Sequence, residues 1–158
     1  MLLRRMEFEL GPDLSDIQLL ADAMERFSKF AAIPSKVLFR LNLAIDELVT
    51  NTISYGFQQG EQCYLGVTVL RHDDVVEVEL RDNGIPFDPL SLPSPDLDAS
   101  LEDRPIGGLG VHFVRTLIEQ VDYTHDGRHN IVRLSVPLHP RSETEPGSPR
   151  HSSGTPQG

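Results

Sequence analysis

The chain has 158 residues, of which 39% are hydrophobic and 24% are charged, and its formal net charge is -10. This length and composition indicate one globular domain with its own hydrophobic core. The chain is acidic and has no cluster of lysine and arginine beyond Arg4 and Arg5. Nucleic acid is therefore excluded as an expected partner, because its binding needs a basic surface.

The sequence also bears on the compartment. Cys63 is the only cysteine, so an intrachain disulfide is excluded, and we interpret this residue as a small buried strand residue. The apolar runs are shorter than the ~20 residues that a membrane-spanning helix needs. Charges interrupt the N-terminus where a signal peptide would be apolar. We expect a cytoplasmic protein that contacts no membrane.

The first third of the chain has the pattern of a strand followed by two helices. Residues 4–10 alternate weakly and predict an edge strand. Apolar residues then recur at helical spacing over 13–31 and, more strongly, over 35–55. Gly56 follows the second segment and predicts its C-terminal end.

The hydrophobic period then changes from that of a helix to that of a strand. Residues 62–71 and 74–82 are rich in Val, Leu and Thr, and His72-Asp73 between them predicts a hairpin. A helix is expected from Gly107 to about Gln120. Two last strands, 121–126 and 130–138, meet at Asp126-Gly127, a dipeptide typical of hairpins. This order predicts an α+β fold in which one mixed sheet carries its helices on one face.

Two segments lack the pattern of a helix or a strand. Residues 86–105 contain five prolines and few aliphatic side chains, which is typical of a lid or a disordered insert. Residues 140–158 contain no aliphatic or aromatic side chain, so we expect a disordered tail. The predicted organisation is one domain over 1–139, with a lid at about 86–106, followed by the tail.

Glu47 and Asn51 form the first candidate site. They lie four residues apart in a predicted helix and so project from one face. A carboxylate and a carboxamide presented together can position a hydroxyl or water and can ligate a hard cation through oxygen. The alternative is that both are solvated residues of the outer helix face.

Asp82-Asn83-Gly84-Ile85-Pro86 forms the second candidate site, directly after a predicted strand. Gly84 permits a sharp turn and a close approach of the backbone to a ligand. The Asp82 carboxylate can accept a hydrogen bond from an exocyclic amine. A plain Asn-Gly turn is the alternative, although Pro86 argues against an immediate hairpin return.

Gly107-Gly108-Leu109-Gly110 forms the third candidate site, at the start of a predicted helix. Backbone N–H groups that no side chain shields make an anion site suited to phosphate. The dinucleotide-binding GxGxxG pattern and the P-loop lysine are both missing from this segment, so those two interpretations fail. A glycine cluster before a helix is weak support by itself.

The order and spacing of the three sites resemble those of the GHKL (Bergerat-fold) ATPase superfamily. ELVTN resembles its N box, DNGIP its G1 box and GGLG its G2 box. Within the superfamily the short chain is similar to the anti-sigma factor serine kinases (RsbW-like). The resemblance covers roughly residues 5–138 and implies a two-layer α/β sandwich with a mixed, mostly antiparallel sheet.

The resemblance implies a role for each matching residue. Asn51 would ligate the Mg²⁺ that bridges the phosphates of ATP, and Glu47 would be the catalytic base. Asp82 would bind the adenine amino group, and Gly84 and Pro86 would complete the base site. The backbone of Gly107, Gly108, Leu109 and Gly110 would approach the phosphates. Such a site acts by positioning and charge neutralisation, as phosphoryl transfer requires.

The sequence departs from the pattern of the relatives at two positions. Many relatives carry a Thr in the penultimate strand that helps to bind adenine through the Asp, and Asn130 would take its place here. Arg104 lies near the position of the basic residue that the relatives carry by the G2 box, without a secure match. Whether Asn130 or Arg104 contacts nucleotide stays open.

The sequence favours an ATP-dependent protein serine/threonine kinase that acts as an anti-sigma factor or related switch regulator. Its expected partners are a STAS-domain anti-anti-sigma protein, a sigma factor and a second copy of the chain. One alternative is a non-catalytic module whose ATP state gates a protein partner. A lower-ranked alternative is an isolated histidine-kinase catalytic domain. His125 and His129 flank the Asp-Gly turn, but a zinc site needs more ligands than two.

Overall fold

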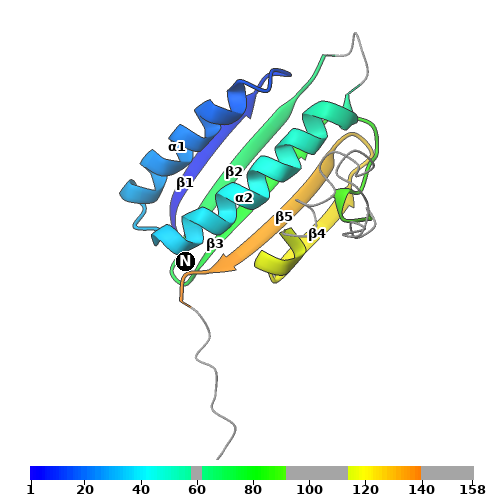
Figure 1. The fold of residues 1–158 in the computed structure, drawn as a ribbon. Coiled ribbons are helices and arrows are strands. Elements are labelled where there is room, and N and C mark those ends of the chain that lie inside the picture. The colour runs from blue at the N-terminus through cyan, green and yellow to red at the C-terminus, as the bar shows by residue number, and fades with distance from the viewer. Residues whose placement is uncertain (58–61, 92–113, 140–158) are drawn as a thin grey trace, which may run out of the picture.

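The computed structural model describes residues 1–57, 62–91 and 114–139. Five strands and two long helices form its framework (Figure 1). In chain order the elements are β1 (Leu2–Leu10), α1 (Asp16–Phe30), α2 (Ser35–Asn51), a π-helical turn η1 (Thr52–Gly56), β2 (Leu65–His72), β3 (Val75–Asp82), a 3₁₀ turn η2 (Pro89–Ser91), β4 (Gln120–His125) and β5 (Asn130–Pro137). Residues 114–117 are also helical.

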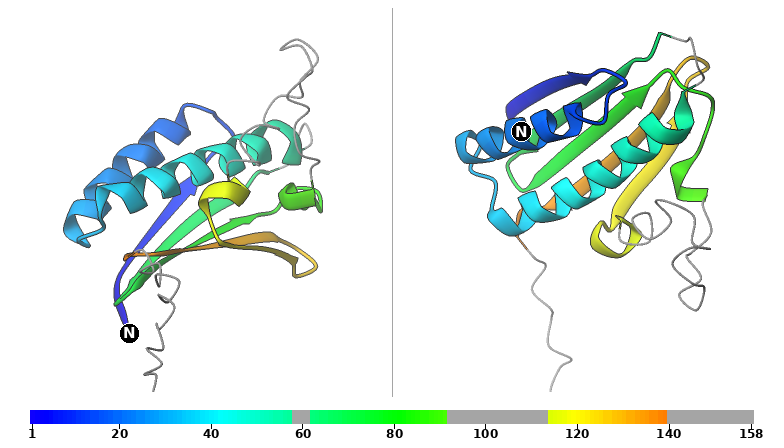
Figure 2. Two further views of the ribbon diagram at one scale, coloured as in Figure 1. Left: turned by 60° about the horizontal axis from the view of Figure 1, so that its bottom comes forward. Right: turned by 45° about the horizontal axis from the view of Figure 1, so that its top comes forward.

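The strands form one sheet in the order β1-β2-β3-β5-β4, and every pairing among the described strands is antiparallel. Helices α1 and α2 lie side by side over the same face of this sheet (Figures 1 and 2). The prediction of a two-layer α+β sandwich with a mostly antiparallel sheet and helices on one face is confirmed.

The core lies between the helices and the sheet. Strands β2, β3 and β5 alternate in burial, as a sheet with one covered face requires. Leu41, Leu48 and Val49 of α2 are almost completely buried against them. The strand side chains of this core are Leu10, Leu65, Val67, Val69, Val76, Val78, Leu80, Val132, Leu134 and Val136.

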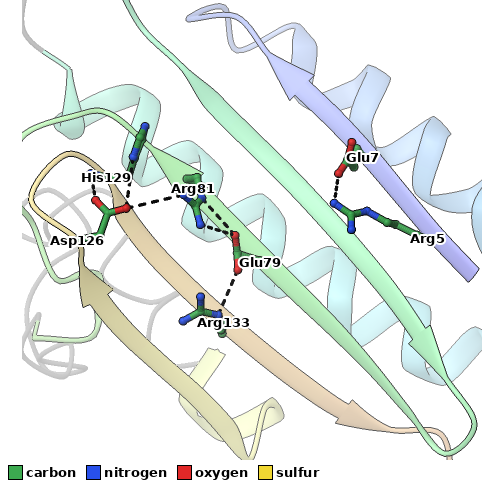
Figure 3. Close-up of polar contacts among 7 residues, drawn as sticks. All are labelled: Arg5, Glu7, Glu79, Arg81, Asp126, His129 and Arg133. Atoms are coloured by element: carbon green, nitrogen blue, oxygen red, sulfur yellow. Dashed lines mark hydrogen bonds and ion pairs between the residues drawn. The ribbon is translucent and has the colours of Figure 1, made fainter. Parts of the chain in front are cut away.

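The opposite face of the sheet carries a network of charged side chains. Glu79 accepts hydrogen bonds from Arg81 of its own strand and from Arg133 of β5, the latter at 3.2 Å (Figure 3). Arg81 also lies 3.8 Å from Asp126, which in turn lies 3.5 Å from His129. These pairs are largely exposed, so each contributes little to stability. They mark the solvated side of the sheet.

The second helix differs from its predicted extent of 35–55. Regular α-helix ends at Asn51, and Thr52–Gly56 form a π-helical turn. The hydroxyl of Thr52 donates to the carbonyl oxygen of Leu48 at 2.9 Å, which is the kind of back-bond that distorts a helix end. Such π turns often lie at functional sites.

Three smaller predictions are wrong. The β2–β3 turn is at Asp73-Asp74, one residue later than predicted, and Gln120 begins β4 because it pairs with Ser135. Cys63 is half-buried and precedes β2, because the pairing of β1 with β2 ends at Leu65.

No helix within the described ranges is long and apolar enough to cross a membrane.

Candidate nucleotide-binding site

Two of the three segments singled out in the sequence meet at one end of the sheet. The end of α2, the turn after β3 and the start of β5 lie together there (Figure 1). The amide of Ile85 donates to the carbonyl oxygen of Gly56 at 2.8 Å, which ties the turn to the helix end. Asn130 donates to Asp82 at 3.0 Å, which ties β5 to β3.

Glu47 and Asn51 lie on one face of α2, as their spacing predicts. The Asn51 amide donates through Nδ2 to Oε1 of Glu47 at 3.2 Å. Asn51 is 2% exposed and Glu47 is half-buried. The alternative interpretation as solvated residues is therefore wrong for Asn51. Since Nδ2 is engaged, Oδ1 is the atom of Asn51 that can ligate a cation.

Burial raises the pKa of Glu47 above that of an ordinary glutamate, and the neighbouring charge of Asp46 adds to the increase. The hydrogen bond from Asn51 opposes these effects because it stabilises the ionised form. A carboxylate with a raised pKa is a better proton acceptor near neutral pH than an ordinary Glu. Glu47 can therefore accept a proton from, or orient, a hydroxyl group.

Asp82 ends β3 and is 7% exposed. Its Oδ1 accepts hydrogen bonds from the Gly84 amide at 2.9 Å and from Asn130 at 3.0 Å. Burial raises the pKa of Asp82, while these two hydrogen bonds and the nearby His129 and His125 lower it. Both contacts with described residues go to Oδ1, so Oδ2 is the oxygen that can accept a hydrogen bond from a ligand amine.

Gly84 packs directly against the end of the second helix. A Cβ at this position would lie 2.4 Å from the carbonyl oxygen of Gly56 and 2.9 Å from Oδ1 of Asp82. The turn thus needs glycine for close packing before any ligand is considered. Pro86, two residues later, is exposed.

Asn83 fixes the turn to the segment before β2. It accepts from the Tyr64 amide at 2.7 Å and donates to the carbonyl oxygen of Gln62 at 2.8 Å. These two hydrogen bonds hold the backbone of the turn in place. Asn83 is exposed, so we assign it this structural role and not a ligand contact. The interpretation of this dipeptide as a plain hairpin turn is wrong, since residues 85–91, which follow it directly, form no strand against β3.

Asn130, the first residue of β5, is 4% exposed and faces Asp82 across the sheet. Its Nδ2 donates to Oδ1 of Asp82 and to the carbonyl oxygen of Ile85, the latter at 2.8 Å. Its Oδ1 accepts from the Phe87 amide at 3.1 Å and from the Tyr123 hydroxyl. Asn130 therefore joins β3, β4 and the turn after β3.

A cavity of about 10 Å³, roughly the room of one water molecule, lies beside Asp82 and Asn130. Thr52, Gly56, Ile85 and Phe87 are among its lining residues. A larger hollow of about 520 Å³ lies on the charged face of the sheet, where Glu79 and Arg133 line it. That hollow is on the far side of the sheet from Asp82, so its size does not make it the site.

The third candidate segment lies outside the described residues. This applies to Gly107, Gly108, Leu109 and Gly110, and likewise to Arg104. The proposed lid beyond Ser91 and the C-terminal segment 140–158 also lie outside the described ranges. Within those ranges no cluster of three or more His, Cys, Asp or Glu side chains could hold a metal ion.

Sequence reasoning missed the contribution of Tyr123 and Phe87 to this site. Tyr123 follows the alternation of β4 and pairs with Val132, so the pattern alone describes it as a core-facing aromatic residue. Phe87 contributes its backbone amide, which leaves no mark in the sequence. The strand order β3-β5-β4 brings Tyr123 to Asn130, the hydrogen-bond partner of Asp82.

Residues 11–136 match the sequence profile of the histidine kinase-like ATPase domain family. The chain belongs to this family. The predicted resemblance to the GHKL superfamily is thereby confirmed, and the matched range includes Glu47, Asn51, Asp82 and Asn130.

Known relatives confirm the similarity to serine kinases of the RsbW type. Serine/threonine-protein kinase BtrW of Bordetella bronchiseptica is 29% identical over 108 residues, covering 68% of this chain and 76% of that protein. Serine-protein kinase RsbW of Listeria monocytogenes is 30% identical over 96 residues, covering 58% of this chain and 61% of that protein. The chain thus spans less than two thirds of the length of the Listeria relative.

A solved structure shows the same fold. The histidine kinase domain of the Erythrobacter litoralis EL346 blue-light activated histidine kinase superposes with a TM-score of 0.52. The superposition covers 82% of this chain and 66% of that chain at 16% sequence identity. At this identity the likeness concerns the fold alone.

Proposed function

We propose that this chain is an ATP-dependent protein serine/threonine kinase that acts as an anti-sigma factor or related switch regulator. The observation that carries the proposal is the pair formed by Glu47 and Asn51, one half-buried and one buried, next to the turn that holds Asp82. The serine-kinase names of its relatives support the same activity. Its proposed substrate is a serine or threonine of a STAS-domain partner protein.

The described residues fit ATP with a magnesium ion. Mg²⁺ is commonly bound by one or two oxygen ligands of the protein together with substrate phosphates. Asn51 Oδ1 would supply the protein oxygen, and Oδ2 of Asp82 would accept from the adenine amino group. Bound Mg²⁺ would neutralise charge on the phosphates. The glycines at 107, 108 and 110 stay our proposal for the phosphate contacts.

Glu47 would act on the hydroxyl group of the partner protein. Its raised pKa suits it to accept the proton of a serine or to orient that hydroxyl toward the terminal phosphate. The hydrogen bond from Asn51 holds the carboxylate in one orientation. A protein that only binds ATP would need the Asn51 amide for the cation but would not need the Glu47 carboxylate. The presence of Glu47 therefore favours catalysis over the gating alternative.

Calorimetric titration with Mg-ATP tests the nucleotide site. We expect the wild-type chain to bind and Asn51→Ala to lose binding, because the cation ligand is removed. Asn42→Ala is the matched control, since Asn42 lies on the same helix in the groove facing α1. Retained affinity in Asn51→Ala would remove this residue from the site.

Transfer of labelled phosphate to candidate STAS-domain proteins tests the kinase activity. Glu47→Gln and Glu47→Ala are expected to bind Mg-ATP but to transfer no phosphate. Asp22→Ala is the control, because Asp22 is an exposed acidic residue of α1 that does not contribute to the pKa shift of Glu47. Unchanged transfer in the Glu47 variants would assign the base elsewhere. ATP binding without transfer to any partner would favour the gating module.

A further inference from the structure

The side chain of Asn130 has no hydrogen-bonding capacity left for a ligand. A carboxamide offers two N–H donors and one oxygen with two lone pairs. The donors go to Asp82 Oδ1 at 3.0 Å and to the carbonyl oxygens of Ile85 at 2.8 Å and Gly84 at 3.4 Å. The oxygen accepts from the Phe87 amide and the Tyr123 hydroxyl. Asn130 therefore acts on a nucleotide only through Asp82.

The backbone dictates which way this amide points. The Phe87 N–H can only donate, so it must meet Oδ1 of Asn130, and the Ile85 carbonyl oxygen can only accept, so it must meet Nδ2. The orientation follows from these two groups without any choice of hydrogen positions. In this orientation Nδ2 is also directed at Asp82.

The amide in turn decides which oxygen of Asp82 is available. Oδ1 already accepts from Asn130 and from the Gly84 amide. A ligand amine is therefore left with Oδ2. If the Asn130 amide turned over, its oxygen would face the carboxylate, and the repulsion would rotate Asp82 away from the position that suits the ligand.

Tyr123 is the side chain that reinforces this orientation from the far side. It lies on β4, two residues from His125, which pairs with Asn130 of β5, and it donates its hydroxyl proton to Oδ1 of Asn130. Its hydroxyl has a raised pKa because of its burial, so it stays a donor over the whole neutral range. Tyr123 of β4, Asn130 of β5 and Asp82 of β3 are thus joined by consecutive hydrogen bonds.

We propose that Tyr123 is a positioning residue for the nucleotide base, acting through Asn130 to orient the Asp82 carboxylate toward an exocyclic amine. This inference rests on the proposed function, since it assumes that Asp82 receives the adenine amino group. Tyr123 itself touches no part of the nucleotide in this arrangement. It contributes to the preference for a base that carries an amine.

The test compares ATP with purine riboside triphosphate, which lacks the 6-amino group, by titration of each into the full chain. Wild-type protein is expected to prefer ATP by roughly tenfold or more, because a hydrogen bond to a carboxylate is worth about 1.5–3 kcal/mol. Tyr123→Phe should lower the affinity for ATP by about fivefold. Its affinity for the analogue should be unchanged, because the analogue makes no contact that depends on Asp82.

Tyr64→Phe is the matched control. The Tyr64 hydroxyl lies near Gly66, on the face of the sheet away from the helices and from Asp82. Its removal should leave the ratio of the two affinities as in wild type. Tyr123→Phe removes one oxygen and leaves the Phe87 amide on Asn130, so the variant should fold, which thermal unfolding will verify.

A full preference for ATP in Tyr123→Phe would overturn the inference, as would an equal loss of affinity for both nucleotides. An equal loss would mean that the hydroxyl only supports the fold. Binding of neither nucleotide by the wild type would overturn the proposed function, and the inference with it. A wild type that prefers ATP, together with a Tyr123→Phe variant whose preference is about fivefold smaller, would support both.

Discussion

Substitution of Gly84 by alanine tests whether the end of the second helix and the turn after β3 are built as one packed unit. The added Cβ would lie 2.4 Å from the carbonyl oxygen of Gly56 and 2.9 Å from Asp82 Oδ1. The first of these neighbours is backbone, so it cannot rotate away. The turn must move, and the 2.8 Å hydrogen bond from Ile85 to Gly56 is the contact that is lost first.

The cost has two parts. Overpacking of a tight site costs typically 1–3 kcal/mol, and loss of one backbone hydrogen bond costs about 1 kcal/mol. We therefore expect Gly84→Ala to lower the free energy of unfolding by about 2–4 kcal/mol without any ligand. For a domain of this size that corresponds to a fall in Tm of roughly 10 °C. Urea unfolding followed by circular dichroism measures it.

Gly127→Ala is the control because Gly127 needs glycine for a different reason. Its φ is +94°, and an added Cβ would meet nothing within 4 Å. Alanine there should cost roughly 1 kcal/mol of backbone strain and leave Mg-ATP binding intact. Gly84 has no such positive φ, so its effect is one of packing alone. A Gly84→Ala variant as stable as wild type would refute the reasoning.

Three further predictions concern the charged and polar groups of the site. Asp82→Asn should abolish Mg-ATP binding, yet it should stabilise the free protein at pH 7 by about 0.5–2 kcal/mol. The pKa of Asp82 is raised in the folded protein, so its ionised form lowers the stability as pH rises through that pKa. Equal or lower stability of the variant in urea unfolding would contradict this. Phosphate transfer should rise with pH along a limb that lies at higher pH than the titration of an ordinary Glu, because Glu47 must be ionised and its pKa is raised. A rate that stays constant on acidification through the range where an ordinary Glu takes up its proton would argue against it. Asn83→Ala should cost about 1–2 kcal/mol in thermal unfolding, since it frees the Tyr64 amide and the Gln62 carbonyl group, whereas an unchanged Tm would show that water replaces both bonds.

Local patterns in the sequence were enough for the elements and for the pairing of Glu47 with Asn51. Helical spacing places residues i and i+4 on one face, and the 3.2 Å hydrogen bond between these side chains follows from that geometry alone. The alternation of β2 and β3 likewise determines which side chains enter the core. Such features depend on neighbours within a few residues, which the sequence states directly.

The end of the second helix was predicted less well. Thr52–Gly56 have the apolar spacing of a continuing helix, yet they form a π turn. The bond from Ile85 to the Gly56 carbonyl is a tertiary contact between residues far apart in the chain. In the sequence Gly56 predicts only the C-terminal end of the helix. The fold shows that its carbonyl oxygen also accepts a hydrogen bond from the turn after β3.

By itself the sequence predicted the family of the chain, a two-layer α+β fold and the placement of Glu47 and Asn51 on one helix face. Only the tertiary structure decided what Asn130 does, because the hydrogen-bond partners of its side chain come from β3, β4 and the turn after β3. The strand order β3-β5-β4 brings them together, and strand order depends on packing over the whole sheet rather than on any local pattern.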